Sequence, residues 1–79
     1  MAKAENVIVY STPTCPFCRQ VKEYLKEKGV EFTDFNAAAD AEARKEMVRK
    51  SGQMGVPVID VDGTIVVGFN RTRLEELLS

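Results

Sequence analysis

The chain has 79 residues and a formal net charge of −1, with 44% hydrophobic and 29% charged residues. This composition is typical of one small globular domain with a thin core, and it argues against a disordered chain. The near-zero charge argues against a nucleic-acid-binding protein, whose affinity depends on neutralising phosphates, and the lack of histidine excludes Ser-His-Asp and Cys-His catalysis.

The chain start and the apolar runs show no sign of a leader or a membrane segment. Residues 1–6 hold one lysine but no apolar stretch, so we expect neither a signal peptide nor a transit peptide. Apolar runs such as residues 7–10 and 65–67 are far shorter than the roughly 20 residues that a transmembrane helix needs. We therefore expect a cytoplasmic protein whose thiols stay reduced.

The first half of the chain predicts a strand-helix-strand unit. Residues 6–11 contain a continuous β-branched and aromatic run, which is typical of a strand covered on both faces. Residues 15–28 repeat apolar side chains at helical spacing, and Gly29 is placed to end this helix in a left-handed conformation. Residues 30–36 predict a second strand, and a unit of this length joins two parallel strands.

The second half predicts a helix, a hairpin and a last short helix. Residues 41–51 form the helix, and residues 72–78 form the last one. Between them, residues 58–61 and 64–67 are β-branched runs separated by an Asp-Gly pair at 62–63, which favours a tight hairpin turn.

These elements predict an α/β fold for residues 1–79, taken as a single domain. A four-stranded mixed sheet, made of a βαβ unit and a β-hairpin, is flanked by three helices. We interpret the strand aromatics as core residues, namely Tyr10, Phe32 and Phe35. We interpret acidic residues in and beside the strands as solvated surface, namely Asp34, Asp60 and Asp62.

A Cys-Pro-Phe-Cys motif lies where the first strand ends and the first helix begins. Helix N-termini carry unsatisfied N–H groups and a partial positive charge, so we expect Cys15 to be stabilised there as a thiolate. Pro16 suits the first helical position because its missing N–H is not needed. Cys18 follows one helical turn later, within reach of Cys15.

These parts predict a thiol–disulfide exchange mechanism. The Cys15 thiolate attacks a substrate disulfide, and Cys18 then attacks Cys15 and releases the reduced substrate. Arg19 and Lys22 add positive charge nearby, unless both simply point to solvent. The alternatives are two incidental thiols or half of a metal site, but a zinc site wants four ligands and only a dimer of this chain supplies four thiolates.

Two further segments are candidates for holding a substrate. A cis bond between Val56 and Pro57 would leave the Val56 backbone free to pair with a substrate strand, whereas the alternative is a plain turn proline. Gly68 permits close approach of a ligand or only ends a strand, and the N–H groups near residues 70–72 suit a carboxylate. Phe17 is either a substrate contact or an exposed rim residue.

In their order along the chain, these motifs resemble the glutaredoxins of the thioredoxin-like superfamily over residues 7–78. The motifs that carry the resemblance are Tyr10-Ser11, Cys15-Pro16-Phe17-Cys18, Val56-Pro57 and Val67-Gly68. The resemblance implies a thioredoxin-like fold, thiol–disulfide oxidoreductase activity, a nucleophilic Cys15, a resolving Cys18 and a cis Pro57. The substrate- or glutathione-binding residues that we carry over are Thr12, Phe17, Val56, Pro57, Gly68, Phe69 and Asn70.

The chain departs from many glutaredoxins at positions that contact glutathione. Thr12 stands where many have a basic residue, and Asn70 and Arg71 stand where an acidic residue follows a Gly-Gly pair. Each lost charged contact costs about 1–3 kcal/mol of affinity, so we expect weak glutathione binding. The Gly-Phe form of the last loop also resembles small redoxins that thioredoxin reductase reduces and that feed ribonucleotide reductase.

The expected partners follow from this resemblance. They are disulfide-containing proteins or glutathione, together with a glutathione- or thioredoxin-reductase system, and neither nucleic acid nor membrane. We expect a monomer with glutathione as co-substrate, no metal and no tightly bound cofactor. The alternatives are a dimer bridged by an iron–sulfur cluster through Cys15 and a redox-controlled interaction partner without turnover.

Overall fold

The computed structural model describes residues 6–53 and 55–78. The expectation of no leader at the chain start therefore falls mostly on residues 1–5, which lie outside the described range. Within the described residues, no helix is both long enough and apolar enough to span a membrane.

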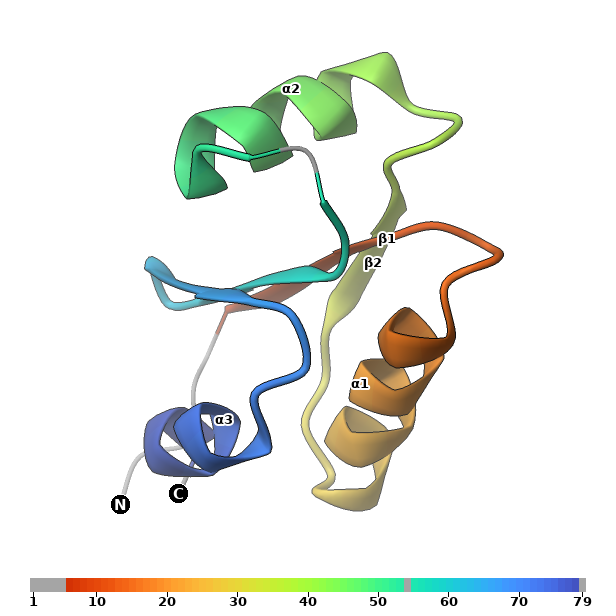
Figure 1. Ribbon diagram of the computed structural model, residues 1–79. Coiled ribbons are helices and arrows are strands. Elements are labelled where there is room, and N and C mark those ends of the chain that lie inside the picture. Colours follow the sequence, from red (N-terminus) through yellow and green to blue (C-terminus); the bar gives the residue numbers. More distant parts are fainter. Residues whose placement is uncertain (1–5, 54, 79) are drawn as a thin grey trace.

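The elements follow the predicted order along the chain. They are β1 (Val7–Ser11), α1 (Pro16–Glu27), β2 (Thr33–Asn36), α2 (Ala41–Ser51), β3 (Val58–Val61), β4 (Thr64–Val67) and α3 (Arg71–Leu78). β1 pairs with β2 in parallel and with β3 antiparallel, and β3 pairs antiparallel with β4, so the sheet order is β2-β1-β3-β4. Helices α1 and α3 lie on one side of the sheet and α2 lies on the other (Figure 1). The predicted four-stranded mixed sheet with three flanking helices is confirmed.

The continuous apolar run of β1 is explained by burial on both of its faces. Val7 and Val9 belong to the core cluster that includes the buried residues of α1 and α3. Tyr10 belongs to the second cluster, together with Met47 of α2, and its ring stacks on Phe35 with centroids 5.7 Å apart. Successive side chains of a strand point to opposite faces of the sheet. When helices cover both faces, all of these side chains can be apolar, and the strand shows no alternation of apolar and polar residues.

The predicted bounds need correction at β2 and α3. β2 begins at Thr33 rather than at residue 30, because the Val30 N–H donates to the Leu25 carbonyl at 3.0 Å, in the turn that follows α1, and not to a neighbouring strand. Residue 71 already opens α3, since the Asn70 side chain accepts from the Arg73 N–H at 3.1 Å and caps the helix.

The hairpin turn has the geometry that its sequence predicts. Asp62 has a φ of 50° and Gly63 a φ of 95°, so both central residues are left-handed, as in the turn that an Asp-Gly pair favours. The turn joins β3 to β4 in register, with Val61 opposite Thr64. The register in turn sets which residues of the hairpin face α2.

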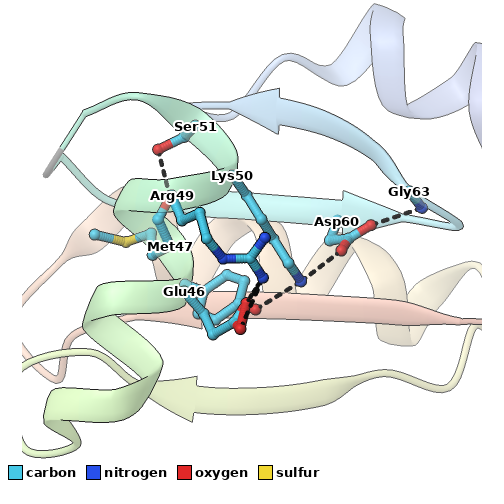
Figure 2. A network of polar contacts seen from close by, with 8 residues as sticks. Glu46, Met47, Arg49, Lys50, Ser51, Asp60 and Gly63 are labelled. Carbon is cyan, nitrogen blue, oxygen red and sulfur yellow. Dashed lines mark hydrogen bonds and ion pairs between the residues drawn. The ribbon is translucent and has the colours of Figure 1, made fainter.

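The interpretation of Asp60 as solvated surface was wrong. Asp60 is only 8% exposed, and its carboxylate accepts from the Lys50 ammonium at 2.7 Å and from the Gly63 N–H at 2.7 Å (Figure 2). The ammonium also donates to the Tyr10 hydroxyl at 2.9 Å. Burial opposes the charge of Lys50, but the bonds to Asp60 and Tyr10 outweigh it and raise the pKa of Lys50. This network ties α2 to β1 and β3.

Candidate active site

Cys15 is the N-cap of α1, where the local sequence holds its sulfur at the helix start. Cys15 is extended, with φ −94° and ψ 112°, and Pro16 fills the first helical position. The Cys18 N–H donates to the Cys15 Sγ at 3.2 Å. The Cys15 N–H donates to the Thr12 carbonyl at 3.3 Å, which closes the turn between β1 and α1. A free N–H of a helix start favours negative charge on the atom that it contacts.

Cys18 is the inaccessible member of the cysteine pair. Cys15 is partly exposed, whereas Cys18 is 0% exposed, and both are free thiols. Burial, followed by the hydrogen bond with the Cys15 side chain, raises the pKa of Cys18 to about 12. At neutral pH Cys18 is therefore a thiol next to the accessible sulfur of Cys15.

The raised pKa of Cys18 predicts a loss of stability at alkaline pH. An unfolded chain loses the Cys18 proton near the ordinary pKa of 9.0, whereas the folded protein keeps it up to about 12. The folded state binds more protons in this window, so the free energy of unfolding falls as pH rises, by up to about 1.4 kcal/mol per pH unit. Urea unfolding of the reduced protein on both sides of pH 9.0 measures the fall.

The matched control for this prediction is Cys18→Ser, which removes the titrating thiol and leaves the other ionisable groups. Its free energy of unfolding should fall less steeply over the same alkaline range than that of the wild-type protein. Equal slopes for the two proteins would contradict the assigned pKa of Cys18.

A triad of polar side chains lies beside the cysteine turn. The Ser11 hydroxyl donates to Asp34 at 2.7 Å, and the Lys22 ammonium contacts Asp34 at 3.0 Å and Ser11 at 3.5 Å. Of the two cations left open by the sequence, Lys22 is thus held by partners, while Arg19 is exposed. Asp34 is exposed, as interpreted, but sequence reasoning missed its contacts with Ser11 and Lys22; a polar residue ending a buried strand was the available signal.

The structure brings Pro57 and Gly68 together. The Val56–Pro57 peptide bond is cis, as the resemblance implied, and the buried Pro57 carbonyl accepts from the Gly68 N–H at 2.8 Å. Gly68 has a φ of 77°, a conformation that favours glycine. Among the described residues, no hydrogen bond joins this pair to the cysteine turn.

The other residues that the resemblance assigns to substrate binding differ in exposure and in side-chain contacts. Phe17 is 58% exposed beside Cys15. Phe69 packs edge-on against Tyr24, with centroids 6.0 Å apart, and the Asn70 side chain caps α3. Arg71 lies over the Tyr24 ring, 5.6 Å from its centroid, and pairs with an acid one turn later in α3. The side chains at positions 69–71 therefore already have partners within the fold.

No metal cluster accompanies the cysteines in the part of the chain that the structure describes. Within residues 6–53 and 55–78, no group of three or more His, Cys, Asp or Glu side chains could hold a metal ion. Chemically, the site therefore offers one accessible thiol, one buried thiol and a helix N-terminus, which suit exchange with a disulfide.

Comparison with known proteins gives consistent matches. The family model described as Glutaredoxin matches residues 7–66. An "uncharacterized glutaredoxin-like 8.6 kDa protein in rubredoxin operon" of Clostridium pasteurianum is 53% identical over 89% of this chain and 93% of its own length. Glutaredoxin 3 of Escherichia coli K12 is 38% identical, over 80% of this chain and 76% of its own. The crystal structure of a glutaredoxin (grx-1) from Archaeoglobus fulgidus superposes with a TM-score of 0.78 at 33% identity, covering 90% of this chain and 83% of that one.

Proposed function

Because the chain belongs to the glutaredoxin family, whose members are thiol–disulfide oxidoreductases, we propose that it reduces protein disulfides or glutathione mixed disulfides through Cys15 and Cys18. The observation that carries this proposal is the partly exposed Cys15 sulfur at the start of α1, accepting the Cys18 N–H next to a fully buried second thiol. Accessibility makes Cys15 the nucleophile, and adjacency makes Cys18 the resolving thiol.

The proposed reaction has two exchanges. The Cys15 thiolate attacks a substrate sulfur, the substrate disulfide breaks, and one substrate thiolate leaves and takes a proton from solvent. Cys18 then loses its proton and attacks Cys15, which forms the Cys15–Cys18 disulfide and releases the second thiolate. The substrate gains two electrons and the dithiol is oxidised.

We propose that backbone groups and one exposed aromatic ring hold the substrate. The hydrogen bonds of the described residues include none from the backbone of Val56, so this backbone is open to pairing with an extended substrate chain. Phe17 supplies an exposed apolar contact. Pro57 and Thr12 are included in the proposed surface on the family resemblance, and residues 68–70 contribute backbone groups, because the side chains of the last two are engaged elsewhere.

We further propose glutathione as a weakly bound co-substrate that reduces the oxidised protein. Thr12 and Asn70 carry no charge, and Arg71 is basic where many glutaredoxins have an acidic residue, so charged contacts to glutathione are few. We place the protein as a monomer in the reducing cytoplasm, where a dithiol is kept in its active form. The iron–sulfur-bridged dimer stays a prediction.

The engaged side chains at positions 69–71 also favour a second candidate. A redoxin reduced by thioredoxin reductase, donating electrons to ribonucleotide reductase, needs no pocket for the charged groups of glutathione.

Competing reductants distinguish these two candidates. The oxidised protein is offered glutathione with glutathione reductase, or thioredoxin reductase alone, and NADPH consumption is followed in both. We expect the glutathione system to reduce it at a rate that rises with glutathione concentration without saturating, because few charged contacts bind the tripeptide. Faster reduction by thioredoxin reductase would replace the first candidate by the second.

A further inference from the structure

The ammonium of Lys22 is fixed in place although it lies near the surface. It contacts the Asp34 carboxylate at 3.0 Å and the Ser11 hydroxyl at 3.5 Å, and the two anchors are joined by a 2.7 Å hydrogen bond. Ser11 is only 3% exposed, so one anchor belongs to the protein interior. A long side chain whose end contacts two partners loses rotamer freedom, so the ammonium charge is held at one position.

The anchored charge and the Cys18 sulfur share the same corner of the fold. Lys22 follows Cys18 by four positions on α1, so both side chains lie on one helix face, one turn apart. Ser11, which holds the ammonium, directly precedes Thr12, whose carbonyl accepts from the Cys15 N–H at 3.3 Å in the same turn. The positive charge of Lys22 lowers the pKa of Cys18, against the larger effect of burial.

The proposed reaction requires Cys18 to carry negative charge twice. Cys18 attacks as a thiolate when the mixed disulfide resolves, and it leaves as a thiolate when a reductant opens the Cys15–Cys18 bond. We propose that Lys22, held by Ser11 and Asp34, is a positioning residue that stabilises negative charge on Cys18 in both exchanges. This inference rests on the proposed function of the two cysteines.

Lys22 takes no part in the bonds or protons that move. In resolution, Cys18 gives its proton to solvent, the Cys18–Cys15 bond forms, the bond from Cys15 to substrate breaks, and the leaving substrate thiolate takes a proton from solvent. In reductive opening, a thiolate of the reductant attacks Cys15 and forms a mixed disulfide with it, the Cys15–Cys18 bond breaks, and the electron pair of that bond stays on Cys18. The ammonium remains protonated and acts only through its charge.

The two exchanges can be timed separately with 5,5′-dithiobis(2-nitrobenzoate). Each attack releases one coloured thiolate, first when Cys15 opens the reagent and then when Cys18 resolves the adduct. Lys22→Met keeps the apolar stem and removes the charge, and Lys22→Arg keeps the charge. Lys26→Met is the matched control, because Lys26 lies exposed one turn further along α1.

We expect Lys22→Met to slow the second release about three- to tenfold, because the lost thiolate fraction is partly offset by higher intrinsic nucleophilicity. The first release should keep its rate, and circular dichroism with the unfolding midpoint shows whether the variant is folded. Lys22→Arg should restore the second rate and Lys26→Met should leave it unchanged. An unchanged second rate in Lys22→Met, or equal slowing in Lys26→Met, would overturn the role of Lys22. A wild-type protein that releases no second thiolate would instead refute the proposed function.

Discussion

Replacing Cys15 by serine is expected to reduce disulfide-reductase activity at least about a hundredfold, as removal of a nucleophile does. A serine hydroxyl stays protonated at neutral pH and forms no bond to sulfur that a thiol can reopen. The remaining thiol, Cys18, is fully buried and cannot reach a protein disulfide. Reduction of insulin disulfides, coupled to NADPH through a reductase, measures the loss.

The fold should survive this change, so the loss reports on chemistry. Serine is a good N-cap and accepts the same N–H that the Cys15 sulfur accepts in the wild-type protein. Circular dichroism and the unfolding midpoint serve as controls, and both should stay close to those of the wild-type protein. A folded Cys15→Ser protein that reduces insulin at the wild-type rate would assign the nucleophile to another group.

Replacing Cys18 by serine is expected to trap the first intermediate. Cys15 remains accessible and attacks the substrate as before, but the neighbouring thiol that resolves the adduct is gone. Resolution then needs an external thiol, and the loss of an intramolecular partner slows release by at least about a hundredfold. Mass spectrometry of the variant mixed with a disulfide peptide should show one peptide bound through Cys15.

The wild-type protein under the same conditions is the control, and it should show an internal disulfide with no bound peptide. Adding glutathione to the trapped variant should release the peptide, which shows that the adduct is a disulfide. A Cys18→Ser protein that forms no adduct, or that sheds it as fast as the wild-type protein, would remove Cys18 from the resolving role.

Much of the site was predictable because it depends on short-range chemistry. The N-cap geometry of Cys15 follows from the proline after it and from the helix that begins there. The left-handed turn at residues 62–63 follows from the Asp-Gly pair itself. The cis bond before Pro57 came only from the family resemblance, since an X-Pro bond alone allows either isomer.

Asp60, the acidic residue that was misjudged, has its cationic partner on another element. It is paired with Lys50 and hydrogen-bonded to the hairpin turn. Asp34 is exposed, as interpreted, but its partners Ser11 and Lys22 lie on other elements. An acidic side chain looks like solvated surface until the element that covers it is known. Nothing in the residues next to Asp60 indicates that element.

The amino-acid sequence alone therefore determined the order of elements, the strand covered on both faces and the position of the two thiols at a helix start. Each depends on periodicity or on residues within one turn of each other. Only the tertiary structure decided that Asp60 is buried and that Lys22 is anchored to Ser11 and Asp34. The burial of a side chain and its hydrogen-bond partners depend on packing between segments that are distant in the sequence. Packing also removes water from ionisable groups, and this desolvation shifts their pKa values.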